Sequence, residues 1–220
     1  MSQAQAPTQA PTPTQAPTPD LLIDILLRQR PREEHVVTLG PGGTSSEAAA
    51  RHLRNRLTAR RACEVTIGLY DRYEDAGEAL RSGEGSLLLV ANAYAGISQF
   101  YMDPGLDLAG AFVFDTPQYG LAARPDARPE GRVRVRVASH PAPVPLIDQL
   151  ILPGLSVEEV VPTHSTSAAA AAAGKGEVDL ALTPAPAAAE HGLTFITRPR
   201  DIRMLWSVFT TGSSGVGRVR

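Results

Sequence analysis

Hydroxyl side chains are concentrated at three places where a predicted strand ends and a predicted helix begins. These places are Thr44-Ser45-Ser46, Ser139-His140-Pro141 and Ser165-Thr166-Ser167. The first turn of a helix presents backbone N–H groups that have no partner within the helix, and such groups bind anions. Ser and Thr are also common helix caps, so three independent caps are the alternative interpretation. The pattern therefore predicts either three capped helices or a site for a polyanionic small molecule.

The stretch from Gly40 to Glu47, Gly-Pro-Gly-Gly-Thr-Ser-Ser-Glu, is the most informative of the three. Glycine lacks a Cβ atom and tolerates positive φ, so the backbone can approach a ligand closely. Glu47 follows Thr44 at the spacing of a capping box. The stretch predicts a glycine turn that leads into a helix, either with an anion at the helix start or as an ordinary connection.

Two other residue types bear on chemistry. His140 is a candidate general acid because the pKa of histidine lies near neutrality, although a helix start disfavours its charged form and a capping or packing role is the alternative. Cys63 is the only cysteine, which excludes an internal disulfide, and no histidine lies near it in sequence. The five histidines show no metal-ligand spacing, so we expect no metal and no cofactor.

Alternating strands and helices must position these residues, and this alternation predicts the α/β fold class. The carboxyl ends of strands in open α/β sheets are where ligands bind, which favours convergence of the hydroxyl-rich turns. We expect strands at 36–39, 64–69, 86–90, 106–114, 119–123, 132–138, 157–161, 178–182, 193–197 and 204–210, and helices at 45–59, 73–82, 139–150, 163–173 and 185–191.

Composition sets the remaining limits. The chain is 43% hydrophobic, enough for one large domain or two small lobes, and its net charge of -2 argues against a nucleic-acid binder. Residues 1–19 contain only Gln, Ala, Pro, Thr and Ser after Met1, which predicts a disordered tail and no secretory signal. Residues 20–35 predict a short helix and linker, too short to span a membrane, and 213–220 a flexible C-terminus. We expect a cytoplasmic protein with no membrane partner.

Five segments, in order, resemble the prephenate dehydratase family. The stretch from Gly40 to Glu47 resembles its Gly-Pro-x-Gly-Thr-aromatic-Ser-Glu signature, and Leu89–Gly96 resembles its Pro-Ile-Glu-Asn-Ser-x-x-Gly loop. Ser139–Ala142 is similar to Ser-His-Pro-Gln, Ser165–Ala169 to Ser-Thr-Ala-Ala-Ala, and Ala188–Leu193 to Ala-Ala-x-x-Tyr-Gly-Leu. The resemblance covers nearly all of the part expected to fold.

The resemblance implies a two-lobed α/β fold with a cleft between the lobes, like a type-two periplasmic binding protein. Lobe one would comprise 36–105 plus 194–212, and lobe two 106–193, with a hinge where the chain crosses. The family also implies prephenate as the small-molecule substrate and a possible homodimer.

Departures from the family pattern indicate a particular branch. Ala91, Ala93 and Ala142 stand where the family has Glu, Ser and Gln, and Ser207-Val208-Phe209 stands where it has the catalytic Thr-Arg-Phe. The chain ends soon afterward, so the phenylalanine-sensing regulatory domain is expected to be absent. With these departures the chain resembles the non-aromatising prephenate decarboxylases of the bacilysin (anticapsin) pathway and related natural-product pathways.

This branch implies loss of CO2 from prephenate with diene isomerisation and retention of the ring hydroxyl, giving a dihydro-4-hydroxyphenylpyruvate. Prephenate dehydratase activity and a non-catalytic dicarboxylate-binding module are the alternatives. Ser207 and His140 are the catalytic candidates, although Ser207 is equally well explained as an ordinary strand residue. The residues expected to bind substrate are Thr44, Ser45, Ser46, Asn92, Ser139, Thr166 and Ser167.

Overall fold

The computed structural model describes residues 33–61, 64–127 and 134–212 of the 220-residue chain. The tail expected at 1–19, the helix expected after it, Cys63 and the C-terminus at 213–220 lie outside the described residues. One part of the expected linker at 20–35 is corrected, because residues 33–35 already belong to the first strand. Within the described ranges, no helix combines the length and the apolar composition that crossing a bilayer requires.

The first sheet contains five strands in the order β2-β1-β3-β10-β4. Strand β1 (Glu33–Leu39) runs parallel to β2 (Glu64–Tyr70) and to β3 (Leu87–Ala91). Strand β10 (Arg203–Thr211) runs antiparallel to β3 and to β4 (Leu106–Asp115). Every residue of β3 is buried, as expected for an apolar strand at the centre of a sheet.

Helices connect the parallel strands of this sheet, as parallel pairing requires. Helix α2 (Ser45–Arg61) follows β1, and α3 (Tyr73–Arg81) follows β2. A short helix, α4 (Ser98–Met102), lies beyond β3, in a segment for which the sequence predicted no element. The carboxyl ends of β1 and β3 and the starts of α2 and α3 consequently lie at the same edge of the sheet.

The second sheet also has five strands, in the order β7-β6-β8-β5-β9. It consists of β5 (Tyr119–Ala123), β6 (Arg134–Ser139), β7 (Ser156–Pro162), β8 (Leu180–Pro184) and β9 (Thr194–Phe195). Its helices are α6 (Thr166–Lys175) after β7 and α7 (Ala185–Glu190) after β8. Alanine side chains of α6 and α7 pack against this sheet, so the helices approach it closely.

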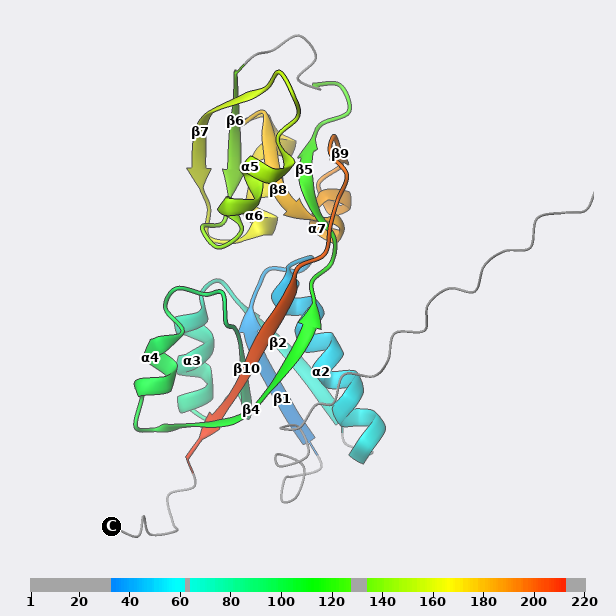
Figure 1. The fold of residues 1–220 in the computed structure, drawn as a ribbon. Helices are drawn as coiled ribbons and strands as arrows, with labels where there is room; N and C mark the ends of the chain where they lie inside the picture. The colour runs from blue at the N-terminus through cyan, green and yellow to red at the C-terminus, as the bar shows by residue number, and fades with distance from the viewer. Residues whose placement is uncertain (1–32, 62–63, 128–133, 213–220) are drawn as a thin grey trace, which may run out of the picture.

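The two sheets form two lobes, and the chain passes between them twice (Figure 1). One passage leads from β4 to β5 and the other from β9 to β10. The passages are bonded to each other: the Thr116 N–H donates to the Ile202 carbonyl at 2.9 Å, and Tyr119 and Arg200 exchange backbone hydrogen bonds of 2.6 and 2.8 Å. The two-lobed α/β fold expected from the sequence is confirmed.

Two strands lie in the other lobe from the one expected. β4 pairs with β10 from Asp115 to Leu106, so residues 106–115 belong to the first sheet rather than to lobe two. β9 pairs with β5, so it belongs to the second sheet rather than to lobe one. Hydrophobic alternation identifies a strand but carries no information about its partner, which explains both differences.

The helix expected at 139–150 is also corrected. A turn follows β6, then a 3₁₀ helix at Val144–Leu146 and a four-residue α-helix, α5 (Ile147–Leu150). Pro141, Pro143 and Pro145 lack the N–H groups that an α-helix needs, so regular helix begins only after them. The other elements begin and end within three residues of the expected positions.

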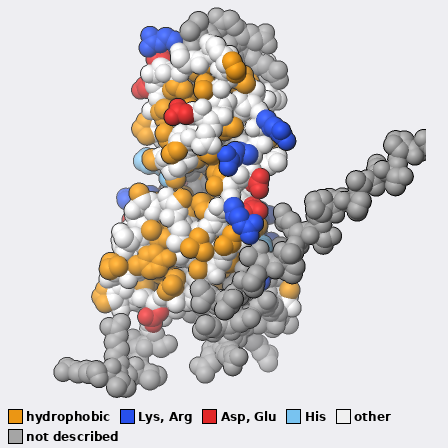
Figure 2. All heavy atoms as spheres, viewed as in Figure 1, with side chains coloured by type: hydrophobic (Ala, Val, Ile, Leu, Met, Phe, Trp, Pro, Cys, Tyr) orange, Lys and Arg blue, Asp and Glu red, His pale blue; other side chains and the backbone are white. Residues whose placement is uncertain are grey.

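One face of the first sheet's lobe, the lower one in Figures 1 and 2, carries exposed apolar side chains. Figure 2 shows hydrophobic side chains gathered over α4, β10 and β4 on the front of this lobe. The exposed members are Tyr101, Met102, Leu108, Val113 and Leu205. Leu205 and Val113 are paired across β10 and β4, so they lie on the same face of the sheet.

Candidate active site

A cavity of about 240 Å³ lies between the lobes. Lobe one lines it with the ends of β1 and β3, the starts of α2 and α3, and alternate residues of β10, while lobe two contributes the start of β5, the segment after β6 and the start of α6. Pockets for drug-sized ligands measure roughly 300–1,000 Å³, so a cavity of about 240 Å³ suits a smaller molecule. The strand ends meet here, as the sequence predicted.

The start of α2 forms one wall of this cavity. Thr44, Ser45 and Ser46 all line it and are 4–6% exposed. Thr44 Oγ1 accepts the N–H of Glu47 at 3.2 Å, while Glu47 Oε2 accepts the N–H of Gly43 at 2.8 Å. Thr44 therefore caps α2 as predicted, while Glu47 bonds the N–H of Gly43 instead of the Thr44 N–H that a capping box would use. The N–H groups of Ser45 and Ser46, the first two helical residues, have no partner within the helix.

The start of α6 forms the opposite wall. Ser165 caps this helix, its Oγ accepting the Ala168 N–H at 3.0 Å, and both Ser165 and Thr166 line the cavity. The N–H groups of Thr166 and Ser167 have no partner within the helix, for the same geometric reason. The positive ends of two helix dipoles therefore meet at the cavity from opposite lobes, which favours a negatively charged ligand.

Tyr119 joins the two helix starts. Its hydroxyl lies 2.7 Å from Ser45 Oγ in the other lobe, and it also hydrogen-bonds the side chain of Thr166. Tyr119 is 5% exposed, and burial raises its pKa. The phenol therefore remains protonated near neutral pH, where it can donate a hydrogen bond.

A second buried tyrosine, Tyr73, lies at the start of α3. Its hydroxyl is 2.8 Å from Ser46 Oγ and accepts the N–H of Ala91 at 3.2 Å. Burial raises the pKa of Tyr73 to about 12. The Tyr73 ring lies 4.8 Å from the ring of Tyr94, whose hydroxyl bonds to the carboxylate of Glu74. Burial, then this bond, raises the pKa of Tyr94 to about 12.

His140 lines the cavity from lobe two. Its Nδ1 accepts the N–H of Ala142 at 3.2 Å, so this nitrogen carries no proton and the neutral ring holds its proton on Nε2. Burial, and then the nearby His164, lower the pKa of His140. At neutral pH the imidazole is therefore an uncharged donor rather than a cation.

The chemical character of the lining is polar but not charged. Among the described residues that line the cavity, none is Asp, Glu, Lys or Arg. Hydroxyls gather at the helix starts, whereas Ile202, Met204 and Trp206 give the cavity an apolar side along β10. Such a site can hold an anion through helix dipoles and neutral donors, and it can surround a hydrocarbon ring with apolar side chains.

Comparison with known proteins identifies two informative relatives. A prephenate decarboxylase of Bacillus subtilis (strain 168) is 38% identical over 179 residues, which cover 80% of this chain and 86% of the relative. A prephenate decarboxylase of Planktothrix agardhii (strain NIVA-CYA 126/8) is 38% identical over 177 residues, covering 79% of this chain and 86% of the relative. The chain belongs to the prephenate decarboxylase family. No protein-family model matches it.

Solved structures confirm the fold of this family member. A prephenate dehydratase from Arthrobacter aurescens, in complex with L-Phe, superposes with a TM-score of 0.60 at 20% identity. The match covers 84% of this chain but 63% of the dehydratase, so the chain spans less than two thirds of that longer protein. A periplasmic substrate-binding protein from Coxiella burnetii superposes with a TM-score of 0.51 at 17% identity. The two-lobed, periplasmic-binding-protein-like fold is thereby confirmed.

Five of the nine predicted site residues of this family member line the cavity: Thr44, Ser45, Ser46, His140 and Thr166. Of the other four, Ser139 is fully buried and donates to the carbonyl of His140 at 2.8 Å, and Ser167 Oγ lies 3.4 Å from His191 Nε2. These two side chains bond to neighbours within lobe two and do not line the cavity, so their predicted contact with substrate stays a prediction.

Ser207 and Asn92 lie outside the cavity lining for a different reason. Side chains alternate along a strand, and Met204 and Trp206 face the cavity, so Ser207 faces the other side of β10. There it donates to Asn92 Oδ1 at 2.8 Å and lies 2.6 Å from the Tyr101 hydroxyl. The Ser207 hydroxyl is therefore directed away from the cavity, and its predicted equivalence with the family's catalytic Thr stays a prediction.

Sequence reasoning also missed residues that line the cavity of this family member. Tyr73 and Tyr119 are the first residues of α3 and β5, and Met204 and Trp206 lie in β10, where the sequence singled out Ser207 alone. A signal for Tyr73 was available, because it begins a helix that follows a parallel strand, at the edge of the sheet where ligands bind.

A groove continues from the cavity and shares Leu39, Tyr73, Tyr94 and His140 with it. The groove adds charged residues to the neutral cavity, among them Arg72, whose side chain is 63% exposed and lies 3.4 Å from Glu74. His164 lines the same groove. The groove also contains Asp71 and Glu74, so two acidic side chains and one arginine lie beside a cavity whose described lining carries no charged residue.

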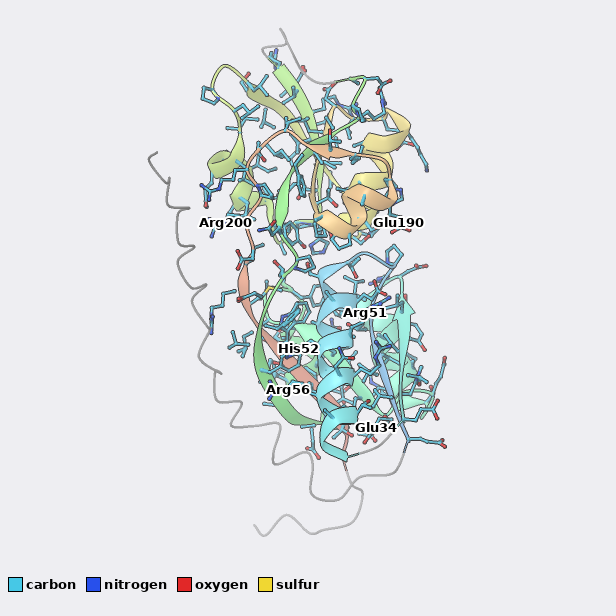
Figure 3. All side chains as sticks on the ribbon, turned by 90° about the vertical axis from the view of Figure 1, so that its right-hand side faces the viewer. Glu34, Arg51, His52, Arg56, Glu190 and Arg200 are labelled. Carbon is cyan, nitrogen blue, oxygen red and sulfur yellow. The ribbon has the colours of Figure 1, made fainter. Side chains whose placement is uncertain are left out.

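Gly43→Ala should lower the free energy of unfolding by more than about 1–2 kcal/mol, the usual penalty for a side chain in the left-handed region. Gly43 has φ +77°, and an added Cβ would lie 3.2 Å from Ala187 and 3.1 Å from Glu190. Figure 3 shows Glu190 on the side of its lobe that faces the start of α2. Urea unfolding measures the loss. Gly42→Ala is the control, since its Cβ would meet Glu47 at 3.8 Å; equal losses would contradict the prediction.

The folded protein should lose stability as the pH falls below 6.5, the ordinary pKa of histidine. Above that pH the imidazole of His140 is neutral in both states, whereas below it the unfolded chain takes up a proton that folded His140 accepts only at lower pH. Thermal unfolding between about pH 5 and pH 8 measures this slope. His140→Gln should flatten it in part, because burial also lowers the pKa of His52. An unchanged slope would contradict the prediction.

Proposed function

We propose that this chain decarboxylates prephenate while retaining the ring hydroxyl, giving a dihydro-4-hydroxyphenylpyruvate. The observation that carries the proposal is the 38% identity to proteins named prephenate decarboxylase, extending over 80% of the chain. The cavity supports it independently, since it offers two helix starts for anionic groups and an apolar side for a ring. Prephenate has this composition: two carboxylates, a ketone and a cyclohexadiene ring.

The two helix starts are the proposed position of the keto-acid carboxylate. Each helix dipole stabilises an anion by about 0.3–1 kcal/mol, and by up to about 2 kcal/mol in partly buried geometry. Ser45 and Thr166 add hydroxyl donors on either side, and Tyr119 lies between them. A carboxylate held there by both lobes would fix the ring against β10.

The ring carboxylate, which leaves as CO2, is placed at the apolar side formed by Ile202, Met204 and Trp206. A carboxylate loses its localised charge as the carbon–carbon bond breaks and the electron pair spreads into the diene. Apolar, water-poor surroundings disfavour the localised charge more than the dispersed one, so they lower the barrier to this step.

In this proposal, prephenate keeps its ring hydroxyl because the described part of the cavity lining contains no carboxylic acid to protonate it. Aromatisation requires an acid that protonates the departing hydroxide, and a dehydratase must supply one. No carboxylic acid side chain lines the cavity among the described residues, and Ala91 and Ala93 stand where the sequence comparison placed Glu and Ser. Without that acid, loss of CO2 ends in protonation of a ring carbon instead of aromatisation.

Mass spectrometry of the products tests the proposal. The purified protein is incubated with prephenate at mildly alkaline pH, with an enzyme-free control for spontaneous aromatisation. A product that has lost CO2 alone is expected. Phenylpyruvate, which has lost both CO2 and water, would indicate a dehydratase. Prephenate recovered unchanged, together with a raised Tm, would indicate the non-catalytic binding module.

The proposed product keeps a non-aromatic ring, so we assign the enzyme to a natural-product pathway rather than to phenylalanine synthesis. The homodimer and the cytoplasmic location expected from the sequence stay predictions, and sedimentation velocity would test the first of them.

A further inference from the structure

We propose that Tyr73, acting with Ser46, donates the proton that the ring carbon takes up after CO2 leaves. The inference rests on the proposed function and deepens it, because the sequence identified no group for this step. Both side chains line the cavity, and both are buried, with Tyr73 3% exposed.

The hydrogen bonds around Tyr73 orient its proton. The Ala91 N–H donates to the phenol oxygen at 3.2 Å, so one side of that oxygen already serves as an acceptor. The O–H bond of Tyr73 must then point elsewhere, and Ser46 Oγ lies 2.8 Å away. When Tyr73 donates to Ser46, the Ser46 proton is free to donate in turn. The pair can therefore deliver a proton into the cavity either directly from Tyr73 or through Ser46.

The other tyrosine hydroxyls in the cavity have different hydrogen-bond partners. The Tyr94 hydroxyl donates to the carboxylate of Glu74, and Tyr119 joins Ser45 and Thr166 at the anion-binding helix starts. His140 uses Nδ1 to accept the Ala142 N–H on the lobe-two wall, so its Nε2 proton is the competing donor. Tyr73 differs from Tyr94 in having no anionic hydrogen-bond partner among the described residues, so its proton is not held by a negative charge. Besides burial, Tyr119 and Tyr94 raise the pKa of Tyr73 electrostatically, and Asp71, Arg72, Glu74, His140 and His164 line the same groove as Tyr73.

The proposed step balances in atoms and charge. The bond between the ring carbon and its carboxylate breaks, CO2 departs, and the electron pair enters the diene. A carbon–hydrogen bond then forms at a ring carbon with the proton of Tyr73, and the resulting phenolate is hydrogen-bonded by Ser46 and Ala91 until water returns a proton. One proton is consumed in each turnover. Burial, which raises the pKa of Tyr73 to about 12, keeps the phenol protonated at working pH.

Decarboxylation in D2O by the full-length chain and by Tyr73→Phe tests this inference. The unmodified protein should place deuterium on one face of one ring carbon, as read by NMR. In Tyr73→Phe, kcat should fall by about 100-fold or more, the usual contribution of a general acid. Its Kd for prephenate should change by less than about threefold, and its residual product should carry deuterium on both faces, because water then supplies the proton.

Tyr70→Phe is the matched control. It removes the same hydroxyl from a tyrosine outside the cavity, whose O–H donates to Glu84 at 2.7 Å, and it should leave rate and labelling unchanged. If Tyr73→Phe does not fold, site-specific replacement of Tyr73 by 3,5-difluorotyrosine tests whether Tyr73 donates the proton. That side chain keeps the phenol but lowers its pKa, so the alkaline limb of kcat against pH should move to lower pH.

The outcomes separate the two proposals. Absence of CO2 release by the unmodified protein would count against the proposed function itself. CO2 release by the unmodified protein, with an undiminished rate and single-face labelling in Tyr73→Phe, would overturn the role of Tyr73 alone. An unmoved alkaline limb in the fluorotyrosine variant would overturn it as well.

Discussion

Replacing Trp206 with alanine should lower the free energy of unfolding by about 3–5 kcal/mol, the range for removing a large aromatic side chain from a core. Trp206 is 0% exposed and belongs to the core of the first lobe, where its Nε1 donates to the carbonyl of Phe114 at 3.3 Å. Domains of this kind are stable by about 5–15 kcal/mol, so the variant should lie close to its unfolding threshold.

Urea unfolding followed by circular dichroism measures this loss. Leu205→Ala is the matched control, because Leu205 is the preceding residue of the same strand but is 43% exposed on the opposite face. The decrease in the free energy of unfolding for Leu205→Ala should be smaller than for Trp206→Ala by at least about 2 kcal/mol. Leu205 buries less apolar surface on folding than Trp206 does. Similar losses in the two variants would show that the facing of β10 has been misassigned.

Ser45→Asp should weaken prephenate binding by at least about tenfold, which corresponds to about 1.4 kcal/mol. The substitution places a carboxylate at the first residue of α2, where the proposed ligand carboxylate would lie. Repulsion between the two anions opposes binding, and the helix dipole is already compensated by the new side chain. The same compensation offsets part of the cost of losing the Ser45–Tyr119 bond, so ligand affinity should fall far more than stability.

Ser45→Asn separates the effect of charge from that of shape. Asparagine nearly matches aspartate in size but is neutral, so it too disrupts the 2.7 Å bond to Tyr119 without introducing repulsion. Isothermal titration calorimetry gives both affinities, and thermal unfolding checks that both variants fold. If the two variants bind prephenate equally, the start of α2 is not the anion site.

Much of the fold could be predicted because local signals agreed with the tertiary structure. The glycine turn before Thr44, the cap at Ser165 and the apolar run of β3 each specify an element without reference to the rest of the chain. Strand partners could not be read in this way. Only the pairing of β4 with β10 reveals that residues 106–115 belong to the first sheet.

The site was less predictable than the fold because it depends on side-chain direction. Thr44 and Thr166 lie at helix starts whose position the sequence fixes, and both line the cavity. Ser207 lies in a strand, where an error of one residue moves a side chain to the opposite face, and it does not line the cavity. Tyr73 belongs to no motif, so its place at the start of a helix after a parallel strand was the only sequence signal for it, and its bonds to Ser46 and Ala91 come from the structure alone.

The paired passages between the lobes restrict how the cavity can open. Because Thr116 is bonded to Ile202, and Tyr119 to Arg200, the passages resist sliding past each other and permit mainly rotation about their common axis. Thr116 and Ile202 themselves line the cavity, so the wall nearest that axis should stay almost stationary while the far rim swings apart. The end of the cavity proposed to hold the ring should therefore keep its shape, while the entrance widens and narrows as ligand enters and leaves.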